Sequence, residues 1–327
     1  MKIGKVPEAV LKRTVLGQIH NRREEVLLGA SVGEDCAAVA VGEDEMLVMS
    51  TDPITGTVQD IGSLAIQITM NDLASAGAEP IGVMLTVLLP ERTSEQKLHR
   101  MIGQAEAACA KVNVQIMGGH TEVTKAVNQP LFSVVGVGKA KKGRLISTAG
   151  ARAGMDIIIS KWIGIEGTSI IAKEKENELL AHYTQSFVDQ AKSFDQMLSV
   201  LPEAAAAVSS GVAAMHDVTE GGIFGALWEM AEASGVGLEI DLKKIPVRQE
   251  TIEICEFFEI NPYELISSGC MLMAADDGNT IVRELEKQGI HAAVVGKATA
   301  GNDRVLYAAD ERRFLEPPKS DELYKVV

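Results

Sequence analysis

The chain has 327 residues, of which 46% are hydrophobic and only 4% aromatic, and its formal net charge is −14. This length exceeds what one hydrophobic core usually supports, so we expect two domains. The acidic balance argues against nucleic-acid binding, which needs clustered basic residues. The four cysteines are scattered without a CxxC pair, which predicts reduced thiols rather than a disulfide framework or a structural zinc site.

The sequence also argues against a membrane or secretory protein. The first residues, Met1 to Pro7, lack the apolar core of a signal peptide. No apolar run approaches the length needed to span a bilayer. We therefore expect a cytoplasmic protein.

The first elements in chain order are a helix, a charged stretch and two strands. The helix is predicted from residue 8 to about residue 19, directly after Pro7. The charged stretch, 21–25, is expected to be solvated surface. Strands are predicted at 37–41 and 46–50, and the short acidic turn between them predicts that they pair as a hairpin.

The stretch 61–76 is predicted to be a buried helix. Ile61, Leu64, Ala65 and Ile68 recur at helical spacing, and Asp72 is the next residue on that face. A carboxylate at the end of an apolar stripe is costly unless a cation or a hydrogen-bond donor meets it. The pattern leaves two interpretations open: a structural carboxylate that caps a loop or pairs with an arginine, or a metal or ligand site.

The rest of the first half continues as alternating strands and helices. A strand is predicted at 81–89 and an amphipathic helix at 94–112. A short strand at 115–117 is expected to run into a turn at 118–121, and another strand covers 131–137. The resulting order, β-β-α-β-α-β-β, is an α+β pattern.

An Ala- and Gly-rich stretch at 148–154 places the domain boundary near residue 150, which gives domains 1–150 and 151–327. The second half predicts an α/β domain with strands at 156–160, 212–215, 237–241, 270–274, 291–295 and 305–308. Helices are predicted at 167–175, 177–182, 187–201, 202–209, 223–233, 250–258 and 279–288. The tail, 316–327, is expected to be peripheral.

Candidate functional residues lie near the ends of these elements. The chain has no Walker A loop, HExxH pair or GxSxG elbow. Asp35, Asp52 and Asp217 each sit at a predicted strand end or an adjacent Gly-rich turn. Carboxylates are the hard oxygen ligands that Mg²⁺ prefers, and backbone N–H groups of Gly-rich turns suit phosphate.

Each of these residues also fits a structural role. Asp52 precedes a proline and is typical of a turn, and Asp217 is typical of a helix cap. His216 fits a hydrogen-bonded structural histidine, and Cys36 fits a small buried residue. Gly221-Gly222 before a helix adds a possible anion site at the helix N-terminus.

Five motifs in order resemble one superfamily, the aminoimidazole ribonucleotide synthase-like, or PurM-like, ATP-binding proteins. The resemblance spans nearly the whole chain. The motifs are Gly33-Glu34-Asp35-Cys36-Ala37-Ala38, Thr51-Asp52, Asn71-Asp72-Leu73-Ala74-Ser75-Ala76-Gly77-Ala78, Gly118-Gly119-His120-Thr121 and His216-Asp217-Val218-Thr219-Glu220-Gly221-Gly222.

The resemblance implies a two-domain PurM-like fold that binds ATP and Mg²⁺. The N-terminal domain, with a mixed sheet, would form a barrel across a homodimer, and the C-terminal domain would be α/β. The implied metal ligands are Asp35, Asp72 and Asp217. The implied nucleotide contacts are Asp35, Asp52, Asn71, Gly118, Gly119, His120 and Thr121, and the implied catalytic residues are Asp72, His120 and Asp217.

Within this superfamily the layout most resembles HypE-like hydrogenase maturation proteins, through residues 234–247 and Asn261-Pro262. HypE carries its carbamoyl group on a C-terminal cysteine, whereas the last cysteine here is Cys270. His120 replaces the acid found in thiamine-monophosphate kinases and in the purine synthases. Selenophosphate synthetase needs an N-terminal cysteine near a lysine, and the first cysteine here is Cys36.

We therefore expect an ATP-dependent enzyme that phosphorylates or dehydrates an amide- or carbamoyl-type substrate and releases ADP and phosphate. The alternatives are a non-catalytic nucleotide-binding maturation or partner protein, and a small-molecule kinase like thiamine-monophosphate kinase. We expect a homodimer, and a maturation role would add a protein partner. The sequence does not identify the acceptor substrate.

Overall fold

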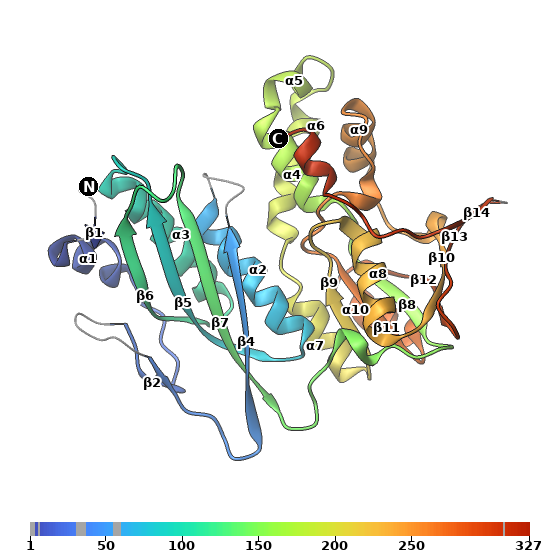
Figure 1. The fold of residues 1–327 in the computed structure, drawn as a ribbon, viewed down its shortest axis with the longest axis horizontal. Helices are drawn as coiled ribbons and strands as arrows, with labels where there is room; N and C mark the ends of the chain where they lie inside the picture. Colours follow the sequence, from blue (N-terminus) through green and yellow to red (C-terminus); the bar gives the residue numbers. More distant parts are fainter. Residues whose placement is uncertain (1–3, 6, 31–36, 55–59, 310) are drawn as a thin grey trace. The chain divides into compact units, whose positions relative to one another are not determined.

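The computed structural model describes residues 4–5, 7–30, 37–54, 60–309 and 311–327. The chain divides into two compact units (Figure 1). The first unit comprises residues 1–74 and 78–145, and the second comprises residues 75–77 and 146–327. No helix of the described residues combines the length and apolar character needed to cross a membrane.

The first unit is built on a five-stranded sheet with the order β1-β6-β5-β7-β4. Strands β5 and β6 run parallel, and the other neighbours are antiparallel. Helices α2 and α3 lie along one face of this sheet (Figure 1). The elements are β1 (Gly4–Lys5), α1 (Glu8–Thr14), η1 (Leu16–Gln18), β2 (Val26–Leu28), β3 (Ala38–Val39), β4 (Glu45–Ile54), α2 (Ile61–Ser75), β5 (Glu79–Leu89), α3 (Glu95–Lys111), β6 (Gln115–Val123) and β7 (Leu131–Lys141).

Glycines allow α2 to pack closely against its neighbours. A Cβ on Gly136 of β7 would lie 2.5 Å from Thr69 Cγ2, and one on Gly62 would lie 2.1 Å from the Met101 carbonyl oxygen of α3. Ile61 and Leu73 of α2 are fully buried. Each buried side chain of this size stabilises the fold by about 1.5–3 kcal/mol. The predicted buried helix is therefore confirmed, and it is held firmly against the sheet.

The predicted hairpin between residues 37–41 and 46–50 is wrong. The turn itself forms, because the Glu45 N–H donates to the Gly42 carbonyl over 3.0 Å. However, β3 pairs with β2, and β4 pairs along its whole length with β7. A long-range partner with a ten-residue ladder outweighs the local turn, and sequence periodicity does not reveal that partner.

The second unit is built on a seven-stranded sheet with the order β14-β13-β10-β12-β8-β11-β9. Only β10 and β13 are parallel among these pairs. Its strands are β8 (Asp156–Ser160), β9 (Ala214–Asp217), β10 (Gly237–Asp241), β11 (Met271–Ala275), β12 (Ala292–Thr299), β13 (Arg304–Ala308) and β14 (Glu311–Phe314). Its helices are η2 (Thr148–Gly150), α4 (Ile165–Glu174), α5 (Glu176–Leu180), α6 (Gln185–Lys192), η3 (Ser193–Met197), α7 (Leu201–Ser209), α8 (Gly222–Ser234), η4 (Leu242–Lys244), α9 (Gln249–Phe257), η5 (Pro262–Glu264), α10 (Gly278–Lys287) and η6 (Glu322–Lys325).

Both faces of the central strand β8 are covered. Ile157 and Ile159 join a core cluster with Leu227 of α8, whereas Ile158 lies beside Gly278 of α10. Alternate side chains of a strand point to opposite faces, so helices must lie on both sides. This explains why β8 reads as a continuous apolar run and matches the expected α/β pattern.

The tail is not peripheral, contrary to the prediction. Glu316, Pro317, Lys319 and Ser320 are exposed, but Asp321 and Glu322 are only 4% and 5% exposed, and Leu323 and Val326 pack against a core cluster of the second unit. The proline pair at 317–318 and the polar residues around it favoured a peripheral tail. They gave no sign that two carboxylates are buried against the rest of the second unit.

Candidate functional site

Asp72 lies on α2 and meets a hydroxyl group of β4. The Ser50 hydroxyl donates a short hydrogen bond to Asp72 Oδ2. Asp52 stands two residues after Ser50 on the same strand, so the two side chains share a face. Asp52 and Asp72 are both half-buried. The structure thus places two carboxylates on the face of the sheet that α2 covers.

Ser50 is a site residue that the sequence reasoning missed. The signal was present, because strand alternation places residue 50 on the same face as residue 52. Without the partner helix in view, Ser50 looked like the polar end of a strand. Asn71, the neighbour of Asp72, is fully buried within α2.

Strand register separates His120 from the two aspartates. One cross-strand row joins Asp52, Val134, Leu85 and Gly119. The next row joins Pro53, Ser133, Thr86 and His120. Successive rows point to opposite faces of a sheet. His120 therefore points away from the α2 face, while Gly119 lies on the same row as Asp52.

The expected turn at 118–121 is wrong, because β6 runs without interruption from Gln115 to Val123. Met117 is an extra residue in the pairing with β5, since Val83 pairs with Ile116 and Met84 with Gly118. Gly119 has φ +148°, and a Cβ there would lie 2.0 Å from the Leu85 carbonyl oxygen. The glycines thus mark a bulge and a close backbone approach inside a strand, not a strand end.

Around this bulge the side chains are accessible. His120 Nε2 lies 3.2 Å from Glu122 Oε2, and the side chains are 43% and 33% exposed. Thr121 is half-buried and pairs with Val87, which places it on the α2 side of the sheet. Gly119, which has no side chain, and the hydroxyl-bearing Thr121 therefore lie on the same face of the sheet as Asp52.

Asp217 lies in the second unit, at the end of the edge strand β9, and is 5% exposed. Its neighbour His216 has Nε2 2.7 Å from Glu229 Oε2 of α8, as expected for a hydrogen-bonded structural histidine. Gly221 and Gly222 have φ +80° and +60° and begin α8. A Cβ on Gly222 would lie 2.6 Å from the Tyr263 carbonyl oxygen, so this position needs glycine.

Asp35 and Cys36 lie outside the described residues. Among the residues that are described, no group of three or more His, Cys, Asp or Glu side chains is arranged to hold a metal ion. Asp52 and Asp72 nevertheless supply carboxylate oxygens on one face, which is the donor type that Mg²⁺ prefers.

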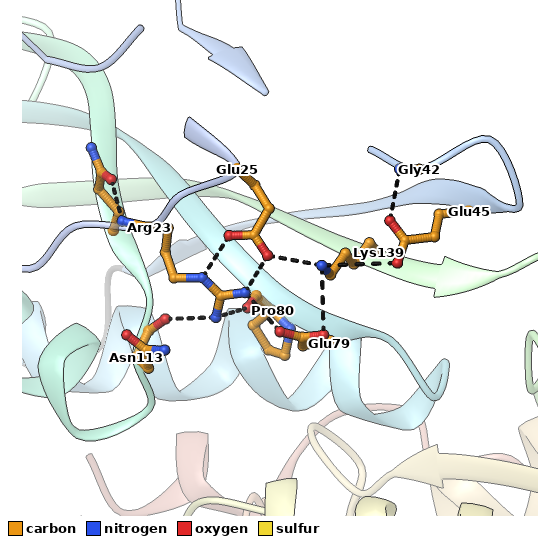
Figure 2. Close-up of polar contacts among 9 residues, drawn as sticks. Arg23, Glu25, Gly42, Glu45, Glu79, Pro80, Asn113 and Lys139 are labelled. Atoms are coloured by element: carbon orange, nitrogen blue, oxygen red, sulfur yellow. Dashed lines mark hydrogen bonds and ion pairs between the residues drawn. The ribbon is translucent and has the colours of Figure 1, made fainter. Parts of the chain in front are cut away.

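A charged network lies on the opposite face of the first sheet (Figure 2). Arg23 reaches Glu25 over 2.6 Å and Glu79 over 2.7 Å, and Lys139 of β7 reaches Glu25 over 2.8 Å. The Arg23 and Glu25 side chains are only 10% and 11% exposed. The prediction of solvated surface at 21–25 therefore holds for Arg22 and Glu24, which are exposed, but is wrong for Arg23 and Glu25, because it missed the long-range partners Glu79 and Lys139.

Two family models match the chain. The N-terminal domain of AIR synthase related protein matches residues 33–140, and the C-terminal domain of AIR synthase related protein matches residues 152–308. The chain is also 32% identical over 278 residues to the carbamoyl dehydratase HypE of Cupriavidus necator, covering 79% of this chain and 76% of that protein. The chain belongs to the AIR synthase related family.

Further comparisons show similarity over the whole length. A putative hydrogenase expression/formation protein of Methanocaldococcus jannaschii is 28% identical over 333 residues, which cover 99% of this chain and 97% of that protein. A crystal structure of the hydrogenase maturation protein HypE in complex with ATP superposes with a TM-score of 0.82 at 21% identity, covering 99% of this chain and 97% of that one. The two-domain PurM-like fold expected from the five motifs is thereby confirmed.

Proposed function

We propose that this chain is an ATP-dependent enzyme of the HypE type that dehydrates a carbamoyl-type substrate and releases ADP and phosphate. The observation that carries the proposal is family membership together with similarity to carbamoyl dehydratase HypE over most of both chains. ATP supplies a phosphoryl group that turns the amide oxygen into a good leaving group. Cleavage of the carbon–oxygen bond then releases phosphate, and the amide nitrogen gives up its two protons as the carbon–nitrogen triple bond forms.

Residue roles follow from the geometry of the first unit. Asp72, oriented by the Ser50 hydroxyl, and Asp52 on the same face would contribute carboxylate oxygens to a Mg²⁺ ion, which would in turn neutralise the phosphates. Such a metal neutralises charge during phosphoryl transfer, which depends mainly on positioning and electrostatics. The backbone of Gly118 to Thr121 would lie along the nucleotide.

The remaining assignments rest on the resemblance of the motifs. Asp35 and Asp217 would also act as carboxylate ligands of Mg²⁺, and Asn71 as a nucleotide contact. The resemblance also assigns a catalytic role to His120, although its imidazole, 3.2 Å from Glu122 Oε2, lies on the sheet face opposite Asp52 and Asp72. In this proposal residues 1–150 form the nucleotide-binding and dimerisation domain, and residues 151–327 form the C-terminal domain.

We propose a homodimer formed through the first sheet, on the face opposite α2. Leu47 and Met49 of the edge strand β4 are 46% and 62% exposed, and Leu27 of β2 is 72% exposed. Strand register places Leu47, Met49 and Lys139 on this same face. An exposed apolar face beside an unpaired sheet edge favours association with a second copy.

Turnover measurements separate this function from its alternatives. The full chain with MgATP is assayed for ADP and phosphate release against a panel of carboxamides, carbamoylated thiols and thiamine monophosphate. Phosphate release that depends on a carbamoyl-type substrate would support the proposal. ADP formation with thiamine monophosphate, without free phosphate, would indicate a kinase. Nucleotide binding without turnover on any substrate would indicate a non-catalytic nucleotide-binding partner.

The two neighbouring glycines of β6 provide a matched pair of variants. Gly119→Ala places a methyl group against the Leu85 carbonyl, so we expect weaker ATP binding and a loss of about 2 kcal/mol or more in stability. In Gly118→Ala the nearest atom is the flexible end of Met84 at 3.4 Å, so the stability should stay close to wild type. Urea unfolding of both variants and calorimetric titration of Gly119→Ala with ATP check this. Equal losses of stability in the two variants would contradict the close approach of Gly119 to the Leu85 backbone.

A further inference from the structure

A cavity of about 490 Å³ lies in the first unit between residues 18–21 and helix α3, and it is here named the α3 cavity. Its lining includes Gln18, Asn21, Glu106, Ala107 and Ala110. These residues belong to other elements than Asp52 and Asp72, which lie on β4 and α2. Cavities of this volume are typical of small-molecule sites. The side chains that line the α3 cavity therefore decide which ligand it fits.

Glu106 contributes a buried carboxylate to the α3 cavity. The residue is only 8% exposed. Its Oε1 accepts hydrogen bonds from the His20 N–H and the Asn21 N–H, each over 2.7 Å. Its Oε2 is buried and accepts no hydrogen bond from any residue that the structure describes. A buried acceptor of this kind is unfavourable without a donor, so Oε2 points to a donor from outside the chain.

Two amide side chains add further acceptors. Gln18 Nε2 donates to the His99 carbonyl over 3.1 Å and also to the Thr14 carbonyl. Asn21 Nδ2 donates to the Val114 carbonyl over 2.7 Å. These bonds to the backbone fix both amide groups and leave their oxygens, Gln18 Oε1 and Asn21 Oδ1, as acceptors. The polar part of the lining thus offers mainly oxygen acceptors.

Small residues of α3 form the rest of the lining. Gly103, Ala107 and Ala110 are four and three residues apart, so they lie along one face of the helix. A Cβ on Gly103 would lie 2.9 Å from Gln18 Oε1, so glycine lets this oxygen approach the helix. Ala107 and Ala110 are exposed and present only methyl groups. An aliphatic chain fits along this face beside the acceptors.

The acceptors select a primary ammonium group among the possible cations. Such a group carries three N–H donors on a compact positive charge, which suits Glu106 Oε2 and the two amide oxygens. A guanidinium pairs best with both oxygens of a carboxylate, and Glu106 Oε1 is already bonded to two backbone N–H groups. A metal ion is disfavoured, because the described residues include no group of three or more His, Cys, Asp or Glu side chains arranged to hold one.

We propose that the α3 cavity is a binding site for a small primary amine. The ammonium group donates a hydrogen bond to Glu106 Oε2, and the aliphatic chain of the amine lies along Ala107 and Ala110. The site uses none of the residues assigned to ATP or Mg²⁺ and goes beyond the proposed function. It requires no nucleotide.

NMR of the full chain without nucleotide tests the proposal, with n-butylammonium chloride as probe. Butylammonium should shift the amide signals of residues 18–21 and 103–110. The n-butyltrimethylammonium ion keeps the charge and the chain but has no N–H donor, so it should bind at least about tenfold more weakly. Neutral n-butanol, which lacks the charge, should also bind at least about tenfold more weakly than butylammonium.

Two variants locate the binding site. Glu106→Gln removes the charge, while its amide oxygen can still accept from the His20 and Asn21 N–H groups, and it should weaken butylammonium binding about tenfold or more. Ala107→Leu fills the cavity from an exposed helix position and should also abolish binding. Glu91→Gln, at an exposed carboxylate of the same unit, is the control and should bind butylammonium like wild type.

Three results would overturn the proposal. The first is that butylammonium shifts no signal in residues 18–21 and 103–110. The second is equal affinity for butylammonium and butyltrimethylammonium, which would indicate general attraction of cations to an acidic chain. The third is unchanged butylammonium affinity in Ala107→Leu, a variant that leaves the buried Glu106 in place. Because no readout uses nucleotide, failure here would leave the proposed function standing, and a failed ATP titration would leave the amine site standing.

Discussion

Glu25 in the first unit and Glu166 in the second are enclosed carboxylates with opposite surroundings. In the first unit, Glu25 is enclosed by the cations Arg23 and Lys139, and the hydrogen bond from Arg23 lowers the pKa of Glu25 far below its usual range (Figure 2). In the second unit, Glu166 and Asp321 are buried beside further acids, and burial raises the pKa of both. The ion pairs hold residues 23–25 against the first sheet. In the second unit, burial disfavours the ionised forms of Glu166 and Asp321, and protonation relieves this unfavourable free energy.

The largest expected effect comes from removing the ion pairs of Arg23 with Glu25 and Glu79. Arg23→Ala leaves the buried Glu25 with Lys139 alone and also removes the hydrogen bond to the Asn113 carbonyl. Removing one partner of a buried ion pair costs about 3 kcal/mol. Urea unfolding should show this loss, while Arg22→Ala, at an exposed position, should stay within about 0.5 kcal/mol of wild type. Equal losses in the two variants would show that the network adds no stability.

Replacing the buried acid Glu166 of the second unit is expected to stabilise the protein instead of destabilising it. The pKa of Glu166 rises from 4.5 to about 7, mainly through burial. Between these values the native state binds a proton that the unfolded chain does not, so this group's contribution to stability falls as the pH rises from about 4.5 to about 7. Glu166→Gln removes that dependence and should raise the free energy of unfolding by about 3 kcal/mol at pH 8.

Calorimetric unfolding at several pH values checks this prediction, with the exposed Glu286→Gln as control. A Glu166→Gln profile that still declines between pH 4.5 and 7 as steeply as wild type would contradict the assignment. For Glu25 the sign is reversed. Its stabilising contribution is present above pH 4.5 and is lost as the pH falls below that value.

The smallest effect is expected at the rim of the acidic region. Tyr324→Phe removes the hydroxyl that donates to Glu220, and Tyr324 is 63% exposed. We expect a loss of less than about 1 kcal/mol in the free energy of unfolding, measured by urea unfolding. A loss as large as that of Arg23→Ala would contradict this ranking.

Local patterns in the sequence predicted the elements well but not their partners. The helix at 61–76 and the strand at 156–160 were predictable, because burial on one or both faces leaves a periodic or continuous apolar signal. The pairing of β4 with β7 was not, because both the turn at Gly42 and the real ladder are compatible with the same alternation.

In the candidate site too, single residues could be predicted from the sequence, but their partners on other elements could not. Asp72 was found because a carboxylate interrupts an apolar stripe, but its partner Ser50 lies on another element. Gly119 was singled out as a turn residue, yet its positive φ accompanies a close approach to the Leu85 backbone inside β6, and the bulge itself lies at Met117. The burial of Arg23 and Asp321 depends on contacts made 56 and 100 residues away, and composition carries no trace of these contacts.

Magnesium-dependent ATP binding by Asp72→Asn tests the central claim most directly. Titration calorimetry compares the full chain with this variant and with Asp44→Asn, an exposed carboxylate of the same unit. We predict that wild type and Asp44→Asn bind ATP more tightly with Mg²⁺ than without it. Asp72→Asn should bind at least tenfold more weakly and lose the Mg²⁺ dependence. Unchanged affinity and Mg²⁺ dependence in Asp72→Asn would contradict the assignment of this carboxylate to the nucleotide site.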